Sequence, residues 1–157
     1  MSEATTNVVA HAYLGIEGKE SPRWWLFTQT KDGYMYVALC DLGIGIPESL
    51  RKTDNENSSA IKKIAELFLK SSQDHHLIEA AFELGKTSTK NKNQGKGMKD
   101  ILSVVESVPG SSLMVFSGRG YHYRKCDETG RSSKYSGAIR QPVRGTLICW
   151  RLQITEE

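Results

Sequence analysis

Two segments early in the chain concentrate aromatic and β-branched residues around a short polar break. Residues 23–30 (RWWLFTQT) and 34–41 (YMYVALCD) flank Lys31, Asp32 and Gly33. Such composition favours β-strands, and an Asp-Gly pair between two strands is typical of a β-hairpin. We therefore predict a hairpin whose second strand ends at Asp41.

Four other segments of the chain, one before the hairpin and three after it, have a helical period. Apolar residues recur every three or four positions in 2–14, 60–72, 75–85 and 98–108, which predicts four helices. Gly85 is expected to end the third helix, and the pair Pro109-Gly110 to end the fourth. The polar, lysine-rich segment between these two helices has no periodicity and predicts a loop.

The last third of the chain returns to a strand pattern. Residues 111–118, 120–126 and 145–154 predict strands, with a turn over 127–133 and a polar loop to Arg144. This order predicts an α+β fold, a two-layer sandwich with a mixed, mostly antiparallel sheet and helices packed on one face. We expect one domain over 1–157. Because the first helix begins at the chain start, we expect a fragment of a longer protein.

Composition and charge exclude some classes of function. The chain has 157 residues, a formal net charge of +3 and three widely spaced cysteines. No cysteine pair has metal-ligand spacing, so we expect reduced thiols in a cytoplasmic protein. No apolar run has membrane-spanning length, and the small net charge does not favour nucleic acid as a partner.

The triplet Gly85-Lys86-Thr87 raises the question of a P-loop. That motif requires a glycine five residues before Gly85, where this chain has Ala80, and it requires a strand entering the loop. The residues before Gly85 have a helical pattern instead. The triplet therefore does not predict a P-loop.

A stronger candidate site follows the predicted hairpin, in the segment 41–47 (DLGIGIP). An acid at the exit of a strand, followed by alternating glycines, lets a carboxylate face a pocket while the backbone approaches a flat ligand. Since a carboxylate only accepts hydrogen bonds, it suits an exocyclic amine such as that of adenine. A plain Asp-Gly turn into a helix is the alternative.

Three further features occur in a consistent order along the chain. Glu3 and Asn7 lie four residues apart, hence on one face of the first helix, and His11 continues that line. Glycines in the segment 95–98 (GKGM) precede a helix, where free backbone N–H groups can bind an anion. Gly145-Thr146 opens the last strand, where the threonine hydroxyl could reach a bound base.

Taken in order, these motifs resemble the ATP-binding domain shared by gyrase B, the ninety-kilodalton heat-shock chaperone, histidine kinases and MutL (the GHKL family, Bergerat fold). The resemblance covers residues 2–154, nearly the whole chain. Residues 2–13 (SEATTNVVAHAY) are most similar to the first motif of bacterial anti-sigma-factor serine/threonine kinases.

The resemblance implies a magnesium-dependent domain that hydrolyses ATP or transfers its phosphoryl group to a protein partner. Glu3 would act on the attacking water, Asn7 would hold magnesium, and Asp41 would read the adenine amine. Residues 86–99 would form the lid over the phosphates. Further implied contacts to the nucleotide are at His11, Gly43, Gly45, Ile46, Lys90, Gly95, Gly97, Met98 and Thr146.

Two alternatives remain open. A narrower one is a serine/threonine protein kinase of an anti-sigma-type partner-switching system, with a protein partner or an additional domain. The other is a non-catalytic module that binds nucleic acid or another polyanion through basic and aromatic residues of the late β region. Those residues are Arg119, Tyr121, Tyr123, Arg124, Lys125, Arg131, Lys134, Tyr135, Arg140 and Arg144. The small net charge favours an ordinary exposed hairpin there.

Overall fold

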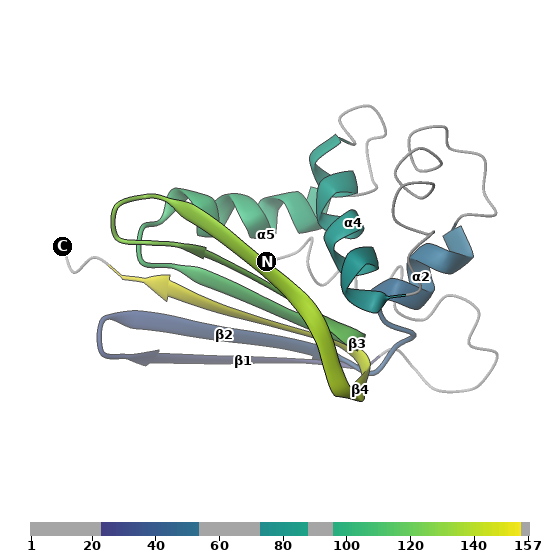
Figure 1. Cartoon of the computed structure of the whole chain (residues 1–157). Coiled ribbons are helices and arrows are strands. Elements are labelled where there is room, and N and C mark those ends of the chain that lie inside the picture. The colour runs from purple at the N-terminus through teal and green to yellow at the C-terminus, as the bar shows by residue number, and fades with distance from the viewer. Residues whose placement is uncertain (1–22, 54–72, 88–95, 155–157) are drawn as a thin grey trace.

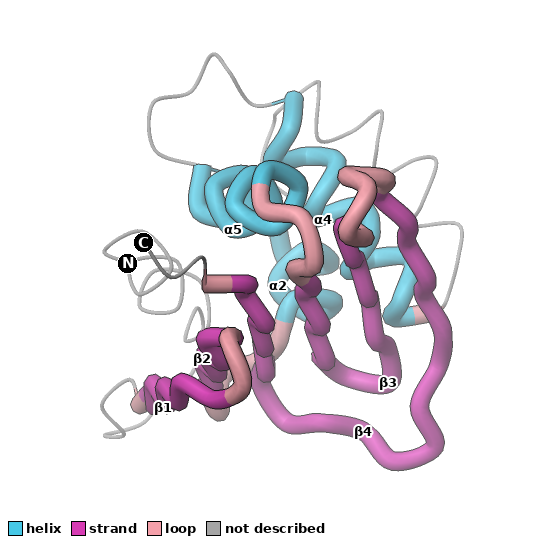
Figure 2. The backbone as a smooth tube through the Cα atoms, turned by 90° about the vertical axis from the view of Figure 1, so that its left-hand side faces the viewer, coloured by secondary structure: helices cyan, strands magenta, loops and turns pink. Residues whose placement is uncertain are grey.

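Four strands form one antiparallel sheet in the computed structural model of the chain, which describes residues 23–53, 73–87 and 96–154. Its spatial order is β1-β2-β4-β3. The strands are β1 (Trp24–Lys31), β2 (Tyr34–Asp41), β3 (Ser112–Cys126) and β4 (Ser132–Gln153). The helices are α2 (Ile46–Thr53), α4 (Asp74–Thr87) and α5 (Lys96–Ser107). All three helices lie on the same side of the sheet, which makes two layers (Figures 1 and 2). The expected α+β class is therefore confirmed.

The predicted hairpin is present, and its turn has the expected chemistry. Strands β1 and β2 pair from Trp24 opposite Asp41 to Lys31 opposite Tyr34. The two turn residues, Asp32 and Gly33, have φ angles of 50° and 74°. Positive φ at both central residues matches the right-handed twist of the flanking strands, and an Asp-Gly pair adopts it at little cost.

The core lies between the helices and one face of the sheet. Strand β3 buries every second residue, including Leu113 and Val115, while α4 contributes Ile78 and Phe82. The remaining core residues are Leu39, Leu102, Val105, Ile148 and Trp150. At about 25 cal/mol per Å² of apolar surface, this burial is the main stabilising contribution of the sandwich.

A β-bulge in β3 positions the start of α4. The register with β4 shifts on either side of Gly118, and the buried positions change from odd to even numbers beyond it. A Cβ on Gly120 would lie 2.5 Å from the backbone nitrogen of His75, so only glycine allows this approach. Asp74 accepts a hydrogen bond from the backbone N–H of Arg119 at 2.7 Å. Asp74 also pairs with Arg51 of α2 at 2.6 Å, which ties both helices to the bulge.

Three sequence expectations are corrected. Helix α4 continues past Gly85 to Thr87 and α5 begins at Lys96, so the described residues leave no more than 88–95 for the expected loop over 86–97. The segment before Arg144, where a polar loop was expected, belongs to β4. Its side chains are mostly exposed, and a strand that faces solvent does not need apolar residues. All described pairings are antiparallel, where a mixed sheet was predicted.

No helix within the described ranges is long and apolar enough to cross a membrane.

Candidate functional site

Asp41 is buried at the exit of β2, beneath the helix layer. Only 4% of its surface is exposed, and in the sheet it lies directly opposite Thr146. One carboxylate oxygen, Oδ1, accepts a hydrogen bond from the backbone N–H of Gly43 at 2.8 Å. Burial raises the pKa of the Asp41 carboxyl, and hydrogen bonds from the backbone N–H groups of Gly43 and Thr146 oppose that rise. The site thus holds a desolvated carboxylate in a fixed orientation.

Ser117 joins this site from β3, and the sequence analysis did not identify it. It is fully buried, and its Oγ accepts a hydrogen bond from the backbone N–H of Ile46 at 2.9 Å. The same hydroxyl donates to the carbonyl oxygen of Gly145 at 2.8 Å and lies 3.2 Å from Oγ1 of Thr146. One signal could have revealed it, because Ser117 continues the buried alternation of Leu113 and Val115 with a polar residue.

Two glycines let three chain segments meet closely at Asp41. Gly45 has a φ of 81°, and a Cβ there would lie 2.7 Å from Oγ of Ser117. Gly145 has a φ of 75°, and its Cβ would lie 2.1 Å from the carbonyl oxygen of Asp41. No L side chain fits at either position without displacing the backbone. The glycines are therefore required by this geometry.

The structure brings together five of the predicted site residues, namely Asp41, Gly43, Gly45, Ile46 and Thr146. Gly97 and Met98 lie in the first turn of α5, where backbone N–H groups have no acceptor within the helix. The remaining predicted residues lie outside the described part of the chain: Glu3, Asn7, His11, Lys90 and Gly95. The arrangement at Asp41 can accept hydrogen bonds from a ligand that reaches the carboxylate.

The triplet Gly85-Lys86-Thr87 forms the end of α4. A P-loop instead follows a strand and precedes a helix. The prediction that this triplet is not a P-loop is therefore confirmed.

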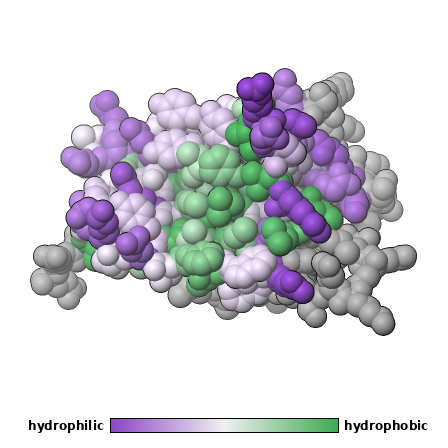
Figure 3. All heavy atoms as spheres, turned by 90° about the horizontal axis from the view of Figure 1, so that it is seen from below, coloured by the Kyte–Doolittle hydropathy of each residue, from purple (hydrophilic) through white to green (hydrophobic). Residues whose placement is uncertain are grey.

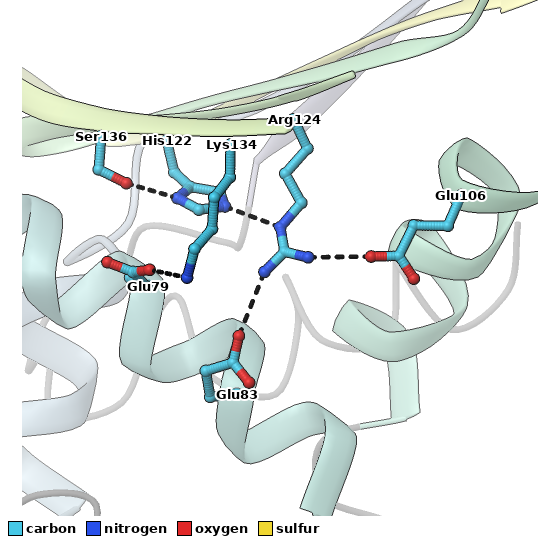
Figure 4. Close-up of polar contacts among 7 residues, drawn as sticks. All are labelled: Glu79, Glu83, Glu106, His122, Arg124, Lys134 and Ser136. Carbon is cyan, nitrogen blue, oxygen red and sulfur yellow. Dashed lines mark hydrogen bonds and ion pairs between the residues drawn. The ribbon is translucent and has the colours of Figure 1, made fainter. Parts of the chain in front are cut away.

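A second polar cluster lies under the far part of β3 and β4 (Figure 4). His122 is fully buried and stacks on Phe82 at 4.9 Å between ring centroids. Arg124 donates through Nε to Nε2 of His122 at 3.0 Å, and its two terminal nitrogens pair with Glu106 at 2.9 Å and Glu83 at 3.2 Å. Sequence reasoning missed this cluster because its members come from four separate elements, β3, β4, α4 and α5.

The hydrogen bonds of His122 determine which ring nitrogen carries the proton. Since Nε2 accepts from Arg124, the proton lies on Nδ1, which donates to Oγ of Ser136 at 2.7 Å. Burial, and then the positive charge of Arg124, lower the pKa of His122 to about 4. A ring that donates to a serine cannot take the proton of that serine, so this pair is structural and not a nucleophile with its base.

Two hollows on the described surface lie near this second cluster and not at Asp41. One of about 260 Å³ is lined by residues that include Glu106, Arg124 and Ser133. The other, of about 270 Å³, is lined by residues that include His75 and Ser136. Within the described ranges no group of three or more His, Cys, Asp or Glu side chains could hold a metal ion. The three cysteines, Cys40, Cys126 and Cys149, are free in the structure.

Comparisons with known proteins do not add a family assignment. No protein-family model matches the chain, and no curated protein matches it.

Proposed function

We propose that the chain is an ATP-binding domain of the GHKL type, with the Bergerat fold, and that Asp41 recognises the adenine base. The observation that carries the proposal is the burial of Asp41 among Gly43, Gly45 and Thr146. Asp41 and Thr146 are separated by more than a hundred residues in sequence, and the sheet places them directly opposite each other. Chance would not favour the two expected base-binding residues sharing one register position.

The hydrogen-bonding chemistry of the Asp41 carboxylate fits the exocyclic amine of a purine. A carboxylate is an acceptor only, and a hydrogen bond to a charged group contributes about 1.5–3 kcal/mol. The amine of adenine donates, whereas guanine has a carbonyl oxygen at the same position, which a carboxylate repels. On this proposal the site prefers ATP and ADP over GTP.

The rest of the nucleotide would extend from Asp41 toward residues that carry the other motifs. The first-turn N–H groups of Gly97 and Met98 supply donors for phosphate oxygens. Asn7 would hold magnesium, and Glu3 would act on water or on the acceptor hydroxyl. Magnesium bound there would neutralise the charge of the phosphates.

Isothermal titration calorimetry with ADP, ATP and GTP, each with and without magnesium chloride, tests the proposal. Asp41→Asn keeps the size of the side chain but removes the charge, and we expect it to weaken ADP binding about 10- to 100-fold. Asp32→Asn is the matched control, because it is the same chemical change at an exposed turn residue whose positive φ asparagine tolerates.

Two results would contradict the proposal. One is the absence of saturable nucleotide binding by the unmodified protein. The other is equal affinity for ADP in the Asp41→Asn and Asp32→Asn variants. If binding is found, incubation with γ-labelled ATP separates hydrolysis, which releases labelled phosphate, from the kinase alternative, which labels a protein partner.

A further inference from the structure

The face of the sheet opposite the helices carries many aromatic side chains. Residues directly opposite each other in an antiparallel sheet point to the same face. Leu39, Val115 and Ile148 share the helix-covered face, so the residues between them point to the other face. We call this second surface the open face. Its aromatic residues are Trp25, Phe27, Tyr34, Tyr36, Phe116, Tyr121, Tyr123 and Tyr135.

Four of these aromatic side chains are exposed, and the others are partly buried. Phe27 is 62% exposed, Tyr135 57%, Trp25 40% and Tyr36 39%. Seen from below the sheet, an apolar patch occupies the centre of the molecule, with hydrophilic side chains at its borders (Figure 3). No described helix covers it. A patch of this kind on a protein surface marks a binding site.

All charged residues at the described strand positions of the open face are basic, while Asp32 of the adjoining turn lies 3.9 Å from Lys31. Lys31, Lys125 and Arg151 occupy strand positions of this face, and no Asp or Glu occupies one among the described residues. The basic side chains on the other face, Arg124 and Lys134, pair with glutamates of the helix layer. Arg124 and Lys134 are therefore neutralised on the covered face. A net charge of +3 conceals this segregation.

We propose that the open face binds single-stranded nucleic acid, with bases stacked on its aromatic rings and phosphates paired with its lysine and arginine side chains. Exposed aromatic residues on a sheet, bordered by cations, are suited to unpaired bases, since every base has a flat π-face. The two kinds of contact require a ligand with both flat apolar groups and regularly spaced negative charge.

Other occupants fit these observations less well. A second copy of the chain would bring its own cations against Lys31 and Arg151, and like charges across an interface are repulsive. An anionic membrane would match the charge, but lipid headgroups have no flat π-face to stack on the rings of the open face. Both are outcomes that the experiment below distinguishes.

Fluorescence anisotropy of a labelled single-stranded oligonucleotide of twenty thymidines or uridines tests the proposal directly. We expect binding at low salt, with a slope of log affinity against log salt of about −2 for three phosphate contacts. Phe27→Ala should weaken binding about 5- to 100-fold, because it removes one stacking ring. Phe27 is largely exposed, so this change should not unfold the protein.

Control variants on the helix layer test whether the loss of any exposed apolar or basic side chain weakens oligonucleotide binding. Val104→Ala removes an exposed apolar side chain of α5, and Lys52→Gln removes an exposed lysine of α2. Both variants should bind the oligonucleotide as the unmodified protein does, whereas Lys31→Gln should weaken binding and make the salt slope shallower. The proposal is independent of nucleotide binding, so Asp41→Asn should also keep the oligonucleotide affinity.

Three results would overturn the proposal. The first is no oligonucleotide binding at low salt. The second is self-association, measured by analytical ultracentrifugation, that Phe27→Ala abolishes while oligonucleotide binding is unaffected. The third is sedimentation with phosphatidylserine vesicles that requires Phe27, in the absence of oligonucleotide binding.

Discussion

His122 should make the stability of the fold depend on pH. It is fully buried, and burial together with the charge of Arg124 lowers its pKa to about 4. In the unfolded chain a histidine titrates near 6.5. Between these two values the unfolded chain takes up a proton that the folded protein does not. Stability is therefore complete above pH 6.5 and falls as the pH decreases toward 4.

The size of the effect follows from the difference between the two pKa values. The folded and reference values, about 4 and 6.5, differ by about 2.5. A pKa difference of 1 corresponds to about 1.36 kcal/mol, so the loss of stability on acidification is limited to about 3 kcal/mol. At pH 5 the linkage relation gives a loss of about 2 kcal/mol relative to pH 7. With a urea dependence of 1–3 kcal/mol per M, the unfolding midpoint should fall by roughly 1 M.

Urea unfolding of the unmodified protein and of His122→Gln, at pH 7, 6 and 5, measures this loss. Glutamine retains one donor for Ser136 and one acceptor for Arg124 but does not titrate. Burial raises the pKa of Asp41, which favours folding at low pH, but both proteins share that residue and their difference removes it. We expect His122→Gln to be less stable at pH 7 and to lose less stability on acidification. Equal pH dependence in the two proteins, or an imidazole NMR signal of His122 that titrates near 6.5, would refute the reasoning.

Two further predictions concern close packing and buried charge. Gly145→Ala should cost about 2–4 kcal/mol, because its Cβ meets the carbonyl oxygen of Asp41, whereas Gly130→Ala, with a similar φ and open space around it, should cost only about 1–2 kcal/mol. Thermal unfolding compares the two. Arg124→Met should cost about 1–3 kcal/mol in urea unfolding, since two half-exposed glutamates lose their buried partner, whereas Lys125→Met on the exposed side should change stability by less than about 0.5 kcal/mol.

Local patterns predicted the hairpin and α4 because their causes are local, while the predicted helices over 2–14 and 60–72 lie outside the described residues. The hairpin depends on Asp32 and Gly33, which adopt the turn conformation by themselves, and α4 follows from its own apolar period. The polar half of β4 was not predicted, because its pairing with β3 and not its own composition makes it a strand. Gly85 did not end α4, since one glycine costs a helix only about 1 kcal/mol.

The candidate site could be predicted only where one segment carries several of its residues. The run from Asp41 to Ile46 could be recognised as one motif because its residues are adjacent in sequence. Ser117, by contrast, is a single serine that becomes informative only when the buried alternation of β3 is known. The cluster around His122 combines two residues of β3 with residues from β4, α4 and α5. No spacing along the chain signals such a cluster, because three-dimensional packing alone brings its members together.

The two proposed binding surfaces occupy opposite faces of the same strand, and this arrangement makes a prediction about their coupling. Phe27 pairs with Ala38, three residues before Asp41, so the two sites lie about 10 Å apart along β2 and point in opposite directions. Mutational effects at that separation, without shared partners, add within about 0.5 kcal/mol. The double variant Asp41→Asn/Phe27→Ala should therefore lose ADP affinity as Asp41→Asn does and oligonucleotide affinity as Phe27→Ala does. A loss of both affinities in either single variant would mean that one surface serves both ligands, and the separation of faces argued from the register of the sheet would be wrong.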